Sequence, residues 1–133
     1  MKRLDTTLLM TDLDGTLLPS TKEILPEELE AIRQFRQQGG KFAIATGRTL
    51  QAAQRYLDRV QADVPVILFN GAGIYDPLSG TMLDTESLPA EAAFQMTRQV
   101  LEAFPEVSAE ILRADGTYAV SYTHLTLPTI LRV

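Results

Sequence analysis

Short apolar runs alternate with helix-length segments through the first 70 residues, and this alternation restricts the chain to few folds. The apolar runs lie at 7–11, 41–45 and 65–69. A first helix is predicted from Pro26 to the Gly39-Gly40 pair, with acidic residues near its start and basic residues near its end, and a second from Leu50 to Val60. Strands separated by helices of this length indicate βαβ units and a parallel sheet in an α/β protein.

The pattern changes after the third apolar run. Two apolar patches within 74–84 flank a Pro- and Gly-containing turn, which indicates a β-hairpin. A helix from Pro89 to Phe104, a strand at 107–112 and a turn at Asp115-Gly116 into another strand are predicted next. We therefore expect a domain boundary near Ser87. Residues 1–86 would form the N-terminal part of an α/β core, and residues 87–119 would begin a second α/β unit.

Composition excludes several classes of partner. The 133 residues carry 17 acidic and 12 basic side chains, a formal net charge of -5, and no basic cluster, so we expect no nucleic acid and no membrane as partners. The absence of cysteine excludes disulfides, thiol nucleophiles and thiolate metal sites. No stretch approaches the roughly 20 apolar residues of a membrane helix. A cytoplasmic protein is expected, and its oligomeric state is not indicated.

The strongest chemical signal is the string Asp12-Leu13-Asp14-Gly15-Thr16, directly after the first apolar run. Catalytic groups of parallel sheets gather at the carboxyl ends of strands, where two carboxylates two residues apart can reach one site. A carboxylate attacks an anionic phosphate ester only if a cation offsets the repulsion, and Mg2+ bound by carboxylate and carbonyl oxygens does so. The pattern points to Asp12 as a nucleophile that forms an aspartyl-phosphate and to Asp14 as the general acid/base.

A plainer interpretation of these residues is an Asp-rich turn after a strand. The string D-x-D-G-T would arise by chance in a chain of this length on the order of 1 time in 1,000, so the chemical interpretation is favoured. Thr46, Gly47 and Arg48 end the second run, and Asn70 ends the third. Alone these would indicate strand ends and turns, but after the first motif they are candidate phosphate- and substrate-binding residues.

Together these motifs resemble the haloacid dehalogenase superfamily, and within it the Cof-like sugar-phosphatase branch with a type IIB cap. The first family motif matches Asp12–Thr16, and the second, an apolar strand ending in Thr, matches Phe42–Thr46. The A-T-G-R string of the branch is Ala45–Arg48, and its N-G-A string is Asn70-Gly71-Ala72. The resemblance extends over about residues 5–118. It implies a Rossmann-like parallel sheet as the core and an inserted α/β cap that begins in 87–119.

This resemblance also implies a function. The expected activity is Mg2+-dependent hydrolysis of a small, sugar-like phosphorylated metabolite. Asp12 would be the nucleophile, Asp14 the general acid/base, and Thr46 a ligand of the transferred phosphoryl group, with Mg2+ held by the Asp12 side chain and the Asp14 backbone carbonyl. Gly47, Arg48 and Asn70 would bind phosphate or substrate. Three alternatives stay open: a phosphomutase on the same fold, a receiver-like signalling module, and a phosphate-binding protein without turnover.

Two parts of the family pattern have no match in the sequence. These are a later lysine that stabilises the aspartyl-phosphate and a later acidic G-D-x-x-x-D-type loop that completes the Mg2+ site. Lys22 and Lys41 stand in the wrong places to replace that lysine. From Val120 to Thr129 the sequence resembles a translated transposase-type sequencing adapter. We therefore expect 120–133 to be a non-native tail, with His124 playing no part in the site, and the chain to be an inactive N-terminal fragment.

Overall fold

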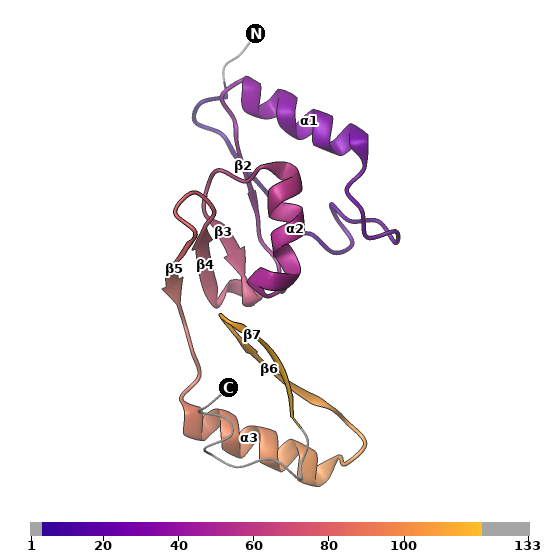
Figure 1. Cartoon of the computed structure of the whole chain (residues 1–133), viewed down its shortest axis with the longest axis vertical. Helices are drawn as coiled ribbons and strands as arrows, with labels where there is room; N and C mark the ends of the chain where they lie inside the picture. Colours follow the sequence, from indigo (N-terminus) through magenta and orange to yellow (C-terminus); the bar gives the residue numbers. More distant parts are fainter. Residues whose placement is uncertain (1–3, 121–133) are drawn as a thin grey trace. The chain divides into compact units, whose positions relative to one another are not determined.

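The computed structural model describes residues 4–120 of the chain. These residues divide after Thr85 into two compact units (Figure 1). The boundary expected near Ser87 lies two residues beyond this division. None of the helices within 4–120 has the length and hydropathy needed to cross a membrane.

Two parallel strands form the first of two small sheets in the first unit. β1 (Leu8–Thr11) pairs in parallel with β2 (Lys41–Ile44). A parallel bridge between Ala45 and Ile67 joins the end of β2 to β3 (Val66–Leu68). Helices α1 (Pro26–Gln37) and α2 (Leu50–Val60) connect these strands in sequence. The mixed α/β architecture expected from the alternating pattern is therefore confirmed.

The second sheet begins with β3 and is antiparallel. A short 3-10 turn, η1 (Phe69–Gly71), leads into β4 (Gly73–Asp76), which pairs with both β3 and β5 (Thr81–Thr85). The β4–β5 connection is the predicted hairpin. The Asp76 carboxylate accepts hydrogen bonds from the backbone N–H groups of Leu78 (3.1 Å) and Ser79 (3.3 Å), which closes its turn.

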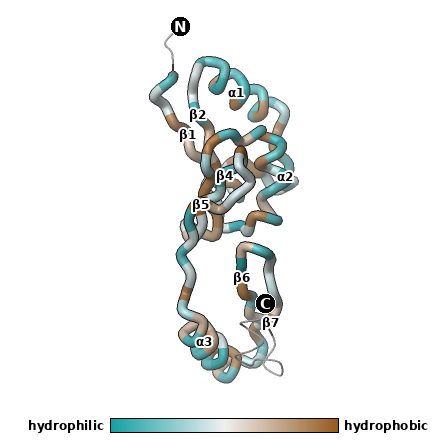
Figure 2. Tube along the Cα trace, turned by 60° about the vertical axis from the view of Figure 1, so that its left-hand side comes forward, coloured by the Kyte–Doolittle hydropathy of each residue, from teal (hydrophilic) through white to brown (hydrophobic). Residues whose placement is uncertain are grey.

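One hydrophobic core lies between the sheet and the helices of this unit. Helix α2 is amphipathic and buries one stripe of side chains, while the Thr49 hydroxyl caps it by accepting a hydrogen bond from the Ala52 N–H at 3.3 Å. The hydrophobic parts of the tube gather around β1, β2 and β4 (Figure 2). The largest side chains that are fully buried are those of Leu13, Leu18, Ile44, Tyr56, Leu57, Val66 and Leu68.

Strand β1 is largely exposed, although an apolar run that ends in a loop is typical of a buried strand. Leu8, Leu9 and Met10 are 56%, 48% and 42% exposed. Among the described residues β1 pairs with β2 alone, so its second edge has no neighbouring strand. An apolar run predicts that a strand forms, whereas the burial of that strand depends on the segments that cover it.

Within residues 86–120, the second unit contains one helix and one hairpin. Helix α3 (Ala90–Ala103) follows Pro89 as predicted, and β6 (Ala109–Arg113) pairs in antiparallel register with β7 (Gly116–Val120). Val120, the first residue of the expected tail, is the last residue of β7. The rest of that tail, 121–133 with His124, lies outside the described residues.

Candidate active site

The loop that follows β1 has buried leucines and exposed carboxylates. Leu13 is completely buried, and Leu18 is 2% exposed, so they anchor the loop in the core. The backbone N–H of Leu18 donates to the Leu13 carbonyl at 2.8 Å, and Gly15 takes a φ of +78°, which few side chains tolerate. Asp12 and Asp14 consequently project outward at the carboxyl end of β1, as the motif predicts.

A second loop, 46–48, is locked to the turn at 69–71. The Phe69 N–H donates to the Arg48 carbonyl, and the Asn70 N–H donates to the Thr46 carbonyl, both at 3.1 Å. Thr46 is only 5% exposed, and its hydroxyl accepts a hydrogen bond from the Arg48 N–H at 3.2 Å. The ends of β2 and β3 are therefore held as one rigid rim beside the Asp12–Asp14 loop.

This rim stores backbone strain. Phe69 and Asn70 have φ of +54° and +56°, and positive φ is unusual for a bulky aromatic residue. The two backbone hydrogen bonds to the 46–48 loop explain how such a conformation persists. Gly47 allows the close approach, because a Cβ atom there would lie 2.6 Å from Asn70 Oδ1. The structure thus brings Thr46, Gly47, Arg48 and Asn70 together.

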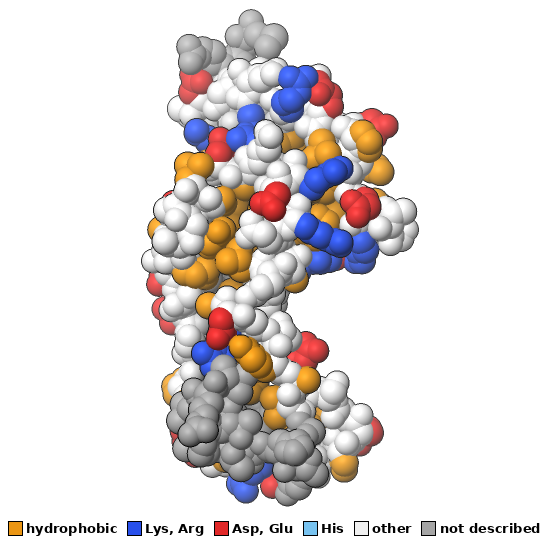
Figure 3. Space-filling model, in the orientation of Figure 1, with side chains coloured by type: hydrophobic (Ala, Val, Ile, Leu, Met, Phe, Trp, Pro, Cys, Tyr) orange, Lys and Arg blue, Asp and Glu red, His pale blue; other side chains and the backbone are white. Residues whose placement is uncertain are grey.

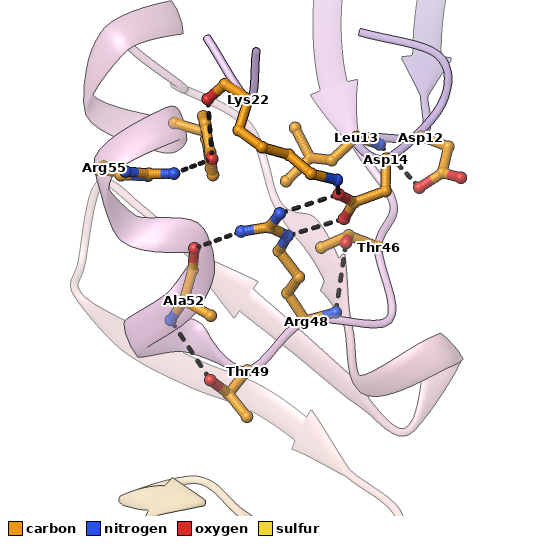
Figure 4. Close-up of polar contacts among 10 residues, drawn as sticks. Asp12, Leu13, Asp14, Lys22, Thr46, Arg48, Thr49, Ala52 and Arg55 are labelled. Carbon is orange, nitrogen blue, oxygen red and sulfur yellow. Dashed lines mark hydrogen bonds and ion pairs between the residues drawn. The ribbon is translucent and has the colours of Figure 1, made fainter. Parts of the chain in front are cut away.

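Asp14 is held by two cations (Figure 4). Arg48 Nε lies 2.7 Å from Asp14 Oδ2, and Arg48 Nη2 lies 2.8 Å from Oδ1, a two-pronged contact. Lys22 Nζ lies 2.8 Å from the same Oδ1. Hydrogen bonds from Arg48 first, and then from Lys22, hold the pKa of the Asp14 carboxyl well below its usual range. Asp14 is therefore an ionised carboxylate in this arrangement.

Tyr56 on α2 contacts Arg48 and Lys22, the two residues that bind Asp14, and also contacts Arg55. The guanidinium carbon of Arg48 lies 5.0 Å from the centre of the buried Tyr56 ring, and that of Arg55 lies 4.5 Å away, at distances of cation–π contacts. The Tyr56 hydroxyl donates to the Lys22 carbonyl at 3.1 Å and accepts a hydrogen bond from Arg55. This contact fixes the Lys22 backbone, which has a φ of +59°.

Lys22 is the residue that sequence reasoning missed. From the sequence alone, Lys22 stands only in the wrong place to replace the later family lysine. Its contact with Asp14 depends on the path of the loop and on Tyr56, 34 residues further on, and no local pattern signals either. Asp12 stands apart from this group: its Oδ1 accepts the Leu13 N–H at 2.7 Å, and its carboxylate points away from the Asp14–Arg48 pair (Figure 4).

The donor set partly fits a magnesium ion. Asp12 presents an exposed carboxylate at the strand end, and hard oxygen ligands of this kind are what Mg2+ prefers. Within 4–120 no group of three or more acidic or histidine side chains lies together in a way that could hold a metal ion. The described residues therefore offer Asp12 and the Asp14 carbonyl as ligands, and water or further groups would have to supply the others.

Comparison with known proteins identifies the family. A model of haloacid dehalogenase-like hydrolases matches residues 9–126. Pyridoxal phosphate phosphatase YbhA of Escherichia coli K12 is 34% identical over 97 residues, covering 73% of this chain and 36% of that protein. The 5-amino-6-(5-phospho-D-ribitylamino)uracil phosphatase YitU of Bacillus subtilis 168 is 34% identical over 70 residues, covering 53% and 26%.

A solved structure supports the same relationship. That of BT4131, described as a HAD subclass IIB sugar phosphatase, aligns with a TM-score of 0.70 at 25% identity, over 85% of this chain and 43% of that one. The chain belongs to the haloacid dehalogenase-like hydrolases, and the predicted resemblance to their Cof-type, subclass IIB branch is confirmed. It spans about a third of the length of the curated relatives it matches.

Proposed function

We propose that the whole protein to which this chain belongs is a Mg2+-dependent phosphatase that hydrolyses small phosphomonoesters through an aspartyl-phosphate. The observation that carries this proposal is the placement of Asp12 and Asp14 on one exposed loop at the end of β1, next to the rim that holds Thr46. Relatives named as phosphatases of pyridoxal phosphate and of a phosphoribityl compound support a phosphorylated metabolite as the substrate class.

Asp12 is the nucleophile in this proposal. One of its carboxylate oxygens forms a bond to phosphorus, while the bond between phosphorus and the leaving oxygen breaks and Asp14, protonated for this step, supplies its proton to that oxygen. Water then attacks the phosphorus of the aspartyl-phosphate, Asp14 takes the proton of the water, and the Asp12 carboxylate is released with inorganic phosphate. When bound by Asp12 and the Asp14 carbonyl, Mg2+ supplies the charge neutralisation that lets a carboxylate approach a phosphate ester.

The binding roles follow from the rim. The Thr46 hydroxyl lies at the end of β2 with Oγ1 hydrogen-bonded to a backbone N–H, which leaves its own O–H available to donate to a phosphoryl oxygen. Gly47 permits the close packing of the loop against Asn70, and Asn70 faces the same edge of the sheet. Arg48 brings a positive charge to the Asp14 side of this edge.

Two alternatives can be compared with this proposal. A receiver-like signalling module is disfavoured by the match to a hydrolase family over residues 9–126. A phosphomutase on the same fold would use the same Asp12 and Asp14 and then return the phosphoryl group to substrate. Relatives named as phosphatases favour hydrolysis.

The decisive experiment is a substitution of the nucleophile. In the whole protein, Asp12→Asn is expected to abolish release of phosphate from a chromogenic phosphomonoester, because an amide cannot form the phosphoenzyme. Asp58→Asn, an exposed change of the same kind on α2, should leave turnover near that of the unaltered protein. Phosphate release by Asp12→Asn at the unaltered rate would disprove the covalent mechanism.

We also propose that the 133-residue chain by itself does not hydrolyse phosphomonoesters. Phosphoryl transfer depends on positioning and charge stabilisation, and the described residues bring two carboxylates to the site without a third acid. Assaying the purified chain with the same ester, with and without Mg2+, tests this. Metal-dependent release of phosphate that disappears in Asp12→Asn would show that the chain is sufficient.

A further inference from the structure

Two cations, Lys22 and Arg48, contact one carboxylate of the candidate site, and a third, Arg55, lies against the same tyrosine as Arg48. Lys22, Arg48 and Arg55 lie around Tyr56, and Asp14 is the one acid among the described residues that forms an ion pair with any of the three. Figure 3 shows basic side chains grouped near α2 on the face in view. These three cations outnumber the two carboxylates of the loop, Asp12 and Asp14, although the chain as a whole is acidic.

The Lys22 ammonium group has N–H donors that no described residue accepts. An ammonium group carries three N–H donors, and the Lys22 side chain makes one hydrogen bond among the described residues, to Asp14. That side chain is 54% exposed, so its remaining donors face solvent. Its backbone is nevertheless fixed by the Tyr56 hydroxyl, which means that the charge is presented from an anchored position.

Arg48 is anchored in the same way. Its guanidinium lies over the Tyr56 ring and also donates to the Ala52 carbonyl at 3.3 Å. It is 23% exposed, and its Nε and Nη2 atoms donate in parallel to Asp14, the geometry with which a guanidinium binds a carboxylate or phosphate. Two pre-positioned cations that share one exposed carboxylate leave a positive charge that a substrate anion can satisfy.

The position of this pair indicates which part of a substrate it meets. Both cations contact Asp14, the residue placed at the leaving oxygen, whereas the Asp12 carboxylate, which would attack phosphorus, points away from them (Figure 4). We propose that Lys22 and Arg48 form a two-cation site for a second acidic group, a carboxylate or a phosphate, on the leaving part of the substrate. This inference rests on the proposed function for the identity of the leaving side and narrows the substrate class to phosphomonoesters that carry another anion.

Binding of a matched ligand pair to the chain tests the inference without requiring turnover. 3-Phosphoglycerate and glycerol 3-phosphate differ in one carboxylate, and their affinities can be measured by titration calorimetry in the presence of Mg2+. We expect 3-phosphoglycerate to bind roughly tenfold more tightly, the order of magnitude of a hydrogen bond to a charged group. Lys22→Gln should remove most of this preference, and Lys22→Arg should keep it.

The control is Lys41→Gln, which removes the same charge from an exposed position on β2 and should preserve the preference. Circular dichroism of each variant verifies that the fold is retained, as expected for a side chain as exposed as Lys22. The inference is overturned if the unaltered, folded chain shows no preference or binds neither ligand, or if Lys22→Gln behaves like Lys41→Gln. An equal loss for both ligands would also overturn it, because the pair would then bind the transferred phosphoryl group. None of these results depends on Asp12→Asn, which tests the proposed function separately.

Discussion

Arg48 binds both carboxylate oxygens of Asp14, a residue 34 positions earlier in the chain, at 2.7 and 2.8 Å. This contact joins the loop after β1 to the loop after β2, the two segments that carry the family motifs. It also holds Asp14 as a carboxylate, which suits a base that takes a proton from water. To donate a proton to a leaving group, Asp14 has to release these cations and become protonated.

Replacing Asp14 should slow catalysis without abolishing the nucleophile. In the whole protein, Asp14→Asn is expected to reduce kcat by about 100- to 10,000-fold, the usual contribution of a general acid/base. The loss should be smaller for an ester with an acidic phenol as leaving group, because such a group needs no proton. Steady-state kinetics with alkyl and nitrophenyl phosphates measure this difference, and an equal loss for both esters would contradict the assigned role.

The ion pairs of Asp14 should make part of the stability depend on pH. The pKa of Asp14 in the folded chain lies below its ordinary value of 3.8, so its stabilising contribution is present above that value and is lost as the pH falls through the folded pKa. Because the side chain is 42% exposed, solvent screening limits the contribution to less than about 1 kcal/mol.

Urea unfolding of the unaltered chain and of Asp14→Asn measures this contribution. The difference in unfolding free energy between them should be constant from pH 7 to 5 and should shrink below pH 4. It should also shrink in 1 M salt, where the screening length is about 3 Å. A difference that grows on acidification would mean that the carboxylate is not stabilised by Arg48 and Lys22.

The packing of Gly47 against Asn70 can be tested by a double-mutant cycle. Gly47→Ala places a Cβ atom 2.6 Å from Asn70 Oδ1, and overpacking of this kind costs about 1–3 kcal/mol. Asn70→Ala removes the atom that clashes, so the double variant should recover much of the loss. Additive free energies of unfolding would show that Asn70 is not the obstacle.

The Tyr56 hydroxyl should contribute measurably to stability. Tyr56→Phe leaves the buried ring in place but removes the hydrogen bond to the Lys22 carbonyl, at a cost of about 0.5–1.5 kcal/mol. Tyr75→Phe is a matched control, since Tyr75 is 8% exposed and its hydroxyl makes no hydrogen bond with the other described residues. Thermal unfolding should distinguish the two variants, and equal melting temperatures would contradict the role given to Tyr56.

Local signals explain why most elements could be predicted from the sequence. Pro26 starts α1, and Gly39 follows its end with a φ of +94°. The two ends of this helix are therefore marked by residues that can be recognised in the sequence. The positions of Asp12 and Asp14 follow from an apolar run and a turn in the same way. The Lys22–Asp14 contact and the strained turn at Phe69 could not be predicted, because each depends on tertiary hydrogen bonds from a distant segment.

Exposure of β1 should limit the solubility of the 133-residue chain. An unpaired strand edge with exposed apolar side chains is a template for association, and Leu8 is 56% exposed on such a strand. Leu8→Lys should therefore raise the concentration at which the chain stays monomeric, and it should change the melting temperature little because few core contacts are lost. Leu13→Lys is the contrasting variant, since Leu13 is completely buried and an uncompensated charge there should unfold the chain. Light scattering and thermal unfolding of the purified variants measure both effects. If Leu8→Lys aggregates as readily as the unaltered chain, association must involve a surface other than β1.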